Sequence, residues 1–128
     1  MSMSRSFRRR VGRGLALART ALGVVAVTTQ ASVARPWVGP LADEPNARLL
    51  GRALGGRDLA LGIGALLSRD QPDAHRLWLT AGAIADSADV AATMMHFGSL
   101  PKRSRWTVLA AAAGGVALAL VALSDADP

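Results

Sequence analysis

The sequence contains no cysteine and very few aromatic residues. The absence of cysteine excludes disulfides, thiolate zinc sites, iron–sulfur clusters and cysteine nucleophiles. Aromatic residues make up only 4% of the chain, so the 51% of hydrophobic residues are mainly Ala, Leu and Val. This composition suits close helix packing better than a β core, and we expect an all-α protein.

Glutamate and lysine are also nearly absent, since each occurs once, at Glu44 and Lys102. The Glu/Lys pairs that usually coat the helices of soluble proteins are therefore missing. Arginine gives the chain a net charge of +6. The arginines cluster only near the N-terminus and are otherwise scattered between apolar runs, so we expect no nucleic-acid partner.

Four apolar segments have about the length that an α-helix needs to cross a bilayer. They predict transmembrane helices over 15–34, 49–68, 77–97 and 106–124. The short, proline-containing links make neighbouring helices antiparallel. We therefore expect one membrane domain over 1–128, a four-helix antiparallel transmembrane bundle. Residues 1–13 are expected to form a disordered basic tail, and the final SDADP a second disordered tail.

All three tryptophans lie at the edges of these segments, at positions 37, 78 and 106. Trp37, Trp78 and Trp106 are therefore predicted to anchor the chain at the two membrane interfaces. Arg19 lies near the start of the first segment, and we expect its side chain to extend to the lipid headgroups.

The N-terminal arginines favour a cytoplasmic N-terminus in a multi-pass inner-membrane protein. Four crossings then place the loop of Lys102, Arg103 and Arg105 outside, against the same rule. A re-entrant second segment would resolve this conflict and stays open as an alternative. A second alternative is a signal peptide cleaved after "ASVA", which would start the mature chain at Arg35 with three helices.

Charged residues occur in the second and third segments, where they are costly at membrane depth. Asp58 lies ten residues before Ser68, and Asp86 and Asp89 lie nine and twelve residues after Leu77. At 1.5 Å per residue these positions reach similar depths in an antiparallel hairpin. Arg57, Asp58, Asp86 and Asp89 are thus predicted to form a buried polar cluster near the bilayer midplane. Its net charge of −2 calls for a proton or another cation, for which Arg52 is a candidate.

Small residues share the helix faces that carry these charges. They are expected to let the second and third helices pack closely, face to face. The two stripes comprise Gly51, Gly55, Asp58 and Gly62, and Gly82, Asp86, Asp89, Thr93 and His96.

No catalytic motif accompanies these residues. The glycines match neither a dinucleotide-binding fingerprint nor a P-loop. Asp86 and His96 are ten residues apart, about 15 Å along a helix, so they cannot share one metal ion. We expect His96 to be interfacial and His75 to lie in a solvated loop. The sequence predicts no enzyme activity, no cofactor and no metal site.

The stretches "GGRDLALGIG" and "AGAIADSADVAATM" resemble a group of uncharacterised small bacterial membrane proteins with four helices. In that group a G-x-R-D/N-x-x-x-G motif is followed by an Asp-bearing helix. The matching positions here are Gly55 or Gly56, Arg57, Asp58, Gly62, Asp86 and Asp89. The chain is also faintly similar to DoxX-like four-helix membrane proteins. The resemblance implies a topology but no reaction.

The expected function is that of a structural or accessory membrane component in a lipid bilayer, with a homo-oligomer or another membrane protein as a possible partner. A small proton- or cation-coupled transporter is the alternative. An exported helical protein with a cleaved signal is the second alternative.

Overall fold

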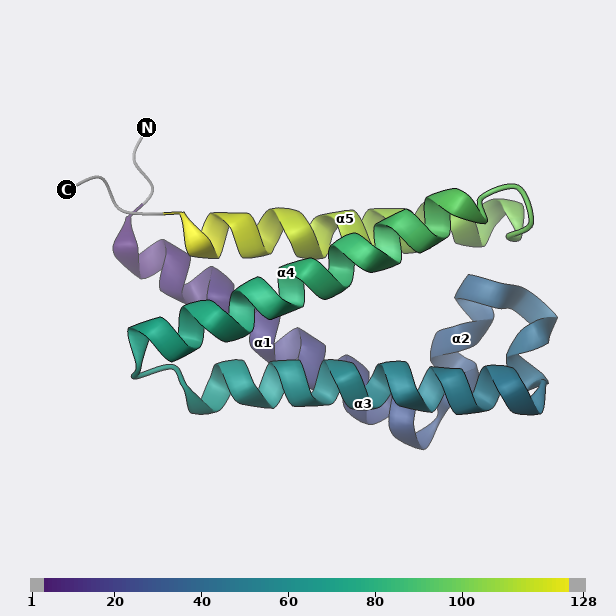
Figure 1. Ribbon diagram of the computed structural model, residues 1–128, viewed down its shortest axis with the longest axis horizontal. Coiled ribbons are helices and arrows are strands. Elements are labelled where there is room, and N and C mark those ends of the chain that lie inside the picture. The colour runs from purple at the N-terminus through teal and green to yellow at the C-terminus, as the bar shows by residue number, and fades with distance from the viewer. Residues whose placement is uncertain (1–3, 125–128) are drawn as a thin grey trace.

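The computed structural model describes residues 4–124, and over this range it contains helices and no strand (Figure 1). The helices are α1 (Arg5–Thr28), α2 (Gln30–Val38), the 3₁₀ helix η1 (Gly39–Asp43), α3 (Pro45–Leu67), α4 (Pro72–Met95) and α5 (Lys102–Leu123). The all-α prediction is confirmed. The expected tail after Ser124 lies outside the described residues.

The largest difference from the sequence-based boundaries concerns the N-terminal region. Residues 5–13 do not form a tail, because α1 begins at Arg5, where the Ser4 hydroxyl accepts a hydrogen bond from the Phe7 backbone N–H at 3.2 Å. The predicted helix over 15–34 also ends early, at Thr28. The Thr29 backbone N–H and hydroxyl both donate to the Val25 carbonyl, and the chain bends there before α2 begins.

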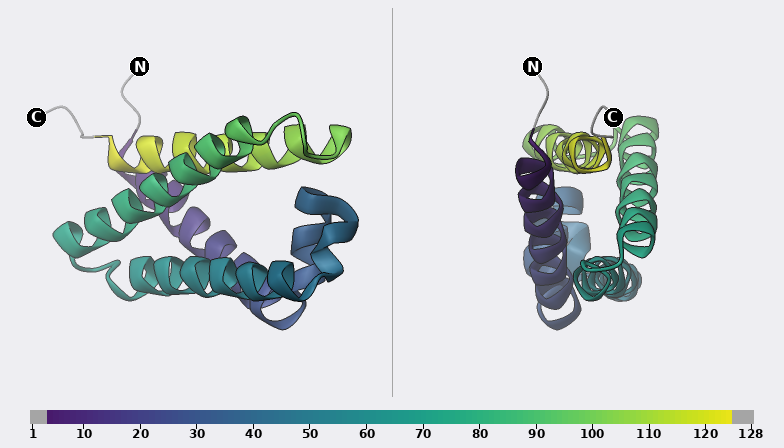
Figure 2. Two further views of the ribbon diagram at one scale, coloured as in Figure 1. Left: turned by 45° about the vertical axis from the view of Figure 1, so that its right-hand side comes forward. Right: turned by 90° about the vertical axis from the view of Figure 1, so that its left-hand side faces the viewer.

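The four long helices run in alternating directions and enclose a central space that side chains fill (Figure 1). Helices α3 and α5 form two opposite edges, while α1 and α4 cross obliquely between them on opposite sides, as the end view in Figure 2 shows. The start of α1, the α3–α4 turn and the end of α5 lie at one end of the bundle, here called the N-terminal end. Helix α2, η1 and the α4–α5 loop lie at the other, the α2 end.

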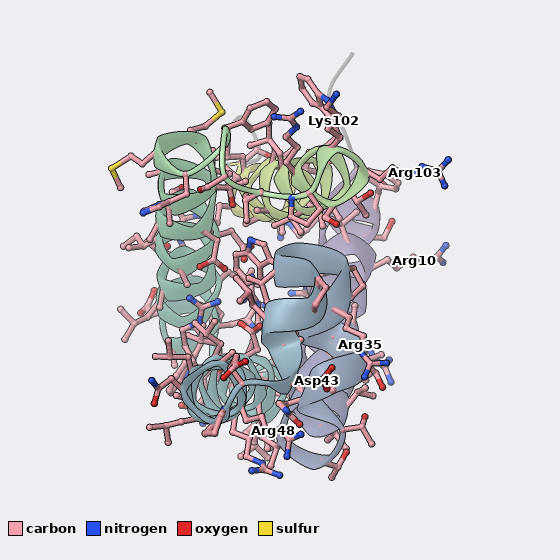
Figure 3. All side chains as sticks on the ribbon, turned by 90° about the vertical axis from the view of Figure 1, so that its right-hand side faces the viewer. Arg10, Arg35, Asp43, Arg48, Lys102 and Arg103 are labelled. Atoms are coloured by element: carbon pink, nitrogen blue, oxygen red, sulfur yellow. The ribbon has the colours of Figure 1, made fainter. Side chains whose placement is uncertain are left out.

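Helix α2 and η1 occupy the space between α3 and α5 at the α2 end (Figures 1 and 2). The two meet at Gly39, the one described residue with a positive φ, 63°, which glycine adopts without steric cost. Ala42 of η1 is fully buried. At the same end the Arg35 guanidinium points towards the Asp43 carboxylate, while Arg48, Lys102 and Arg103 extend outwards (Figure 3).

The interior is made of small and polar residues, whereas the large apolar side chains point outwards. Among the buried hydrophobic residues, Leu79 alone is larger than alanine. Exposed large apolar side chains occur on all four long helices, for example Leu22, Val25, Leu50, Ile63, Ile84, Met95, Leu118 and Leu120. This is the reverse of the distribution in a soluble helical bundle.

Helices α1 and α3 approach each other closely through glycines. A Cβ added to Gly55 would lie 2.7 Å from the Cβ of Ala26, and one added to Gly62 would lie 2.6 Å from the backbone nitrogen of Thr20. From the α1 side, a Cβ on Gly23 would lie 2.8 Å from the Gly55 carbonyl oxygen. The contact therefore needs bare Cα atoms at these positions.

These contacts correct the expected arrangement of the glycine stripes. Gly55 and Gly62 face α1 rather than the helix that carries Asp86. Gly51 lies against Gln30 of α2, and Gly82 lies against the Arg19 side chain of α1. The second and third predicted helices thus do not pack face to face through their glycines.

We expect Gly55→Ala to lower the unfolding free energy by about 1–3 kcal/mol, because its methyl group overpacks the α1–α3 contact. Gly56→Ala is the matched control, since a Cβ at Gly56 meets nothing within 4 Å. It should leave stability unchanged or raise it by up to about 1 kcal/mol through helix propensity. Thermal unfolding of both variants in detergent measures the difference. Equal melting temperatures would contradict the close α1–α3 contact.

Candidate functional site

Arg19 of α1 lies at the centre of the bundle between two carboxylates. Its Nη1 donates to Asp58 Oδ1 of α3 at 2.7 Å, and its Nη2 donates to Asp86 Oδ2 of α4 at 2.5 Å. The Arg19 side chain is only 9% exposed. The expectation that Arg19 reaches the lipid headgroups is therefore wrong. One guanidinium ties three helices together.

Arg57 of α3 makes the second set of ion pairs. Its Nη1 and Nη2 donate to the two oxygens of Asp89 at 3.1 and 2.8 Å, and Nη2 also donates to Asp58 Oδ1 at 3.3 Å. Asp58 thus accepts from both arginines. We call these five residues the Arg/Asp network: Arg19, Arg57, Asp58, Asp86 and Asp89.

The structure brings all four predicted cluster residues together and adds Arg19 to them. Arg57 pairs with Asp89, the carboxylate one helical turn beyond Asp86, and Asp86 pairs with Arg19. Arg52, the other cation considered, lies outside the network, where its Nε donates to the Val27 carbonyl at 3.4 Å. The cation closest to Asp86 therefore comes from α1.

Helix α5 accommodates the network without contributing a side chain to it. A Cβ added to Gly115 would overlap the Asp86 carboxylate. The Gly82 carbonyl of α4 accepts a further, longer bond from Arg19 Nη2 at 3.5 Å. The bare Cα of Gly115 on α5 thus provides the space for the Asp86 carboxylate.

With Arg19 included, two guanidiniums face three carboxylates, and the formal charge of the network is −1. Helix α5 adds no charge, because its sequence from Trp106 to Leu123 contains no ionisable residue. Within residues 4–124 no group of His, Cys, Asp or Glu side chains is placed to hold a metal ion. A cavity of about 10 Å³ beside Arg19, lined also by Leu79 and Gly82, has room for about one water molecule.

The two histidines have local structural roles. His75 does not lie in a loop: it belongs to the first turn of α4, and its Nδ1 lies 2.8 Å from the Ala65 carbonyl oxygen of α3. A carbonyl only accepts hydrogen bonds, so Nδ1 carries the proton. The Ser68 hydroxyl donates to the same Ala65 carbonyl at 3.3 Å, so two side chains satisfy this carbonyl in the last turn of α3. His96 is exposed at the end of α4, with Nδ1 3.0 Å from the Ala92 carbonyl oxygen.

The tryptophans lie near both ends of the bundle. Trp78, in the second turn of α4, lies against Gly64 of α3 towards the N-terminal end. Trp37 of α2 and Trp106 of α5 lie at the α2 end, where Trp106 meets Phe97 edge to face at a centroid distance of 5.0 Å. Their role as interface anchors stays a prediction.

No protein-family model matches the chain, and no curated protein or solved structure shows significant similarity to it. The resemblance to small four-helix membrane proteins therefore stays an expectation. The site has to be interpreted from its own geometry.

We expect Arg19→Gln to lower the unfolding free energy by about 3–5 kcal/mol, because it leaves Asp58 and Asp86 buried without their shared cation. Arg13→Gln is the matched control, since Arg13 is an exposed arginine on the same helix. Denaturant unfolding in a fixed detergent measures both variants. A loss no larger than that of Arg13→Gln would contradict the central role of Arg19.

The observed pairing also predicts which charge exchange restores the fold. Arg57→Asp should reduce the yield of folded protein in membranes, and adding Asp89→Arg should restore part of it by returning opposite charges to the pair. Adding Asp86→Arg instead should restore nothing, because it places a second cation beside Arg19. Quantification of membrane-extracted, monodisperse protein tests this. Equal recovery in both double variants would contradict the Arg57–Asp89 pair.

Proposed function

We propose that the protein is a multi-pass integral membrane protein, a structural or accessory component of the cytoplasmic membrane, whose Arg/Asp network holds its helices in one arrangement. The observation that carries the proposal is the inverted polarity of the bundle. Ionic groups lie inside it, and the large apolar side chains lie outside on every long helix.

The dimensions of the helices support a membrane location. Two of the described helices, α1 and α5, are long and apolar enough to cross a membrane. Helices α3 and α4 have 23 and 24 residues, about 35 Å at 1.5 Å per residue, against a hydrocarbon core of about 30 Å. The charges in the middle of these helices, Arg57, Asp58, Asp86 and Asp89, belong to the network, whereas Arg48, Arg52, Asp73 and Arg76 lie towards the helix ends. In a bilayer the outward apolar side chains would therefore meet lipid.

The contacts within the network favour a structural role over transport. Each carboxylate accepts from at least one guanidinium, and the pairs join α1, α3 and α4. The cavity beside Arg19 measures about 10 Å³ and has room for about one water molecule. Buried ion pairs of this kind fix which helices pack together more than they add stability. We therefore place the transporter alternative second.

Arg19 also bears on whether the first helix is retained. Cleavage before Arg35 would remove the cation that Asp58 and Asp86 share, and it would remove the helix that packs on Gly55 and Gly62. We therefore propose that α1 is not a cleaved signal peptide. An exported protein that begins at Arg35 would lack α1 and would have to pack its remaining helices around a different interior.

We propose that the N-terminal end faces the cytoplasm. It carries Arg5, Arg8, Arg9, Arg10, Arg13, Arg69 and Arg76. The α2 end carries six basic residues, Arg35, Arg48, Arg52, Lys102, Arg103 and Arg105, of which Arg35 pairs with Asp43 and Arg105 donates to the Phe97 carbonyl. The N-terminal end has one more, and five of its seven lie together on the first turns of α1. By the positive-inside rule this small excess favours a cytoplasmic N-terminal end. Helix α3 is continuous from one end to the other, which favours a full crossing over a re-entrant segment.

Reporter fusions test this topology in cells. Fusions after residues 70 and 124 should report a cytoplasmic location, and fusions after residues 42 and 100 should report the opposite side. Extraction of membranes with alkaline carbonate should leave the protein in the pellet. Release into the supernatant would overturn the membrane proposal, whereas a pellet with non-alternating signals would overturn only the topology.

A further inference from the structure

The first two turns of α1 are rich in arginine and precede the apolar part of the helix. Because α1 begins at Arg5, the arginines preceding the apolar part belong to one continuous helix. Arg5, Arg9 and Arg13 follow a spacing of four residues, and Arg10 adjoins them; all four are exposed, and Arg10 extends away from the bundle in Figure 3. The outward surface of α1 thus changes from cationic to apolar within one turn, between Arg13 and the exposed Leu17.

Among the described residues 4–124, no carboxylate forms an ion pair with Arg5, Arg9, Arg10 or Arg13. Helix α1 contains no Asp or Glu. Two acidic residues lie at the neighbouring α3–α4 turn: Asp70 pairs with Arg69 at 3.3 Å, and Asp73 is exposed in the first turn of α4. Exposed cations at the α2 end are spread over three helices instead, at Arg35 of α2, Arg48 and Arg52 of α3, and Lys102 and Arg103 of α5. The density of positive charge is therefore highest on the first turns of α1.

We propose that Arg5, Arg9, Arg10 and Arg13 form a binding surface for the phosphate headgroups of anionic phospholipids in the adjacent leaflet. The proposal rests on the membrane location proposed above. Guanidinium groups match phosphate oxygens in a fork geometry, and a basic helix segment next to a membrane span attracts anionic lipids. Arg13 and Leu17 are four residues apart, about 6 Å along the helix axis. When Leu17 lies in the hydrocarbon core, the arginines therefore lie at the level of the lipid headgroups.

The test uses the full chain reconstituted in phosphatidylcholine nanodiscs with spin-labelled phosphatidylglycerol or phosphatidylcholine as the probe. The fraction of motionally restricted probe gives the preference for the anionic lipid. The variant R5Q/R9Q/R10Q/R13Q should lose this preference by about fivefold or more. The control R48Q/R52Q/K102Q/R103Q removes the same charge from the α2 end and should retain it. Raising the salt concentration should weaken the preference of the wild type.

The outcomes separate this proposal from the one on which it rests. A chain that does not enter nanodiscs overturns the membrane location. If the chain enters nanodiscs but shows no preference for phosphatidylglycerol, the lipid-binding proposal is overturned while the membrane location stands. The basic surface would then be expected to bind an acidic segment of another protein. Equal losses in the two quadruple variants show that net charge, and not this surface, determines the preference, and they also overturn the proposal.

Discussion

The structure depends on one guanidinium shared between two carboxylates. Helices α1 and α4 lie on opposite sides of the bundle, and the long side chain of Arg19 bridges them while also binding Asp58 on α3. An apolar side chain at this position would leave two carboxylates without a cation in a poorly solvated interior. The choice of neighbours in the bundle is therefore determined by charge pairing as well as by shape.

The small residues around the network follow from the same constraint. The Arg19 ion pairs, at 2.5 and 2.7 Å, need the backbones of three helices within reach of one another. Gly23, Gly55 and Gly62 bring α1 onto α3, and Gly115 lets α5 lie over the Asp86 carboxylate. With the interior occupied mainly by glycine, alanine and charged groups, only a few leucines, such as Leu79 and Leu66, pack inwards, and most large apolar side chains lie outside. The inverted polarity is thus a consequence of what the interior has to contain.

Much of this arrangement could be predicted from the sequence. Composition and the length of the apolar segments predict the all-helical fold, and counting residues from the α3–α4 turn places Asp58, Asp86 and Asp89 at similar heights. Arg19 was misjudged because the first helix was expected to start at residue 15, which puts Arg19 near its end. The helix starts at Arg5, so Arg19 lies fourteen residues from one end and nine from the other. The Ser4 cap that extends the helix was a readable signal, but the five arginines in residues 5–13 suggested a tail instead.

Other features could not be read from one sequence. Both Asp86 and Asp89 lie within reach of Arg57 by depth, and only the rotation of α4 about its axis decides that Asp89 is the partner. The glycine stripe of α3 has the same periodicity whichever helix it faces, so its contact with α1 depends on the global arrangement. Periodicity defines a face of a helix but does not identify its neighbour.

The separation of Arg19 from its partners along the chain has a consequence for biogenesis. Asp58 follows Arg19 by 39 residues and Asp86 follows it by 67. During synthesis α1 emerges first, and its arginine has no carboxylate to pair with until the later helices have left the ribosome. By length and hydropathy α1 could enter a bilayer alone, whereas α3 and α4 carry the carboxylates and do not pass the same test. If the chain enters a bilayer, the unpaired Arg19 of the first crossing would therefore provide the cation that the Asp residues of the later helices need.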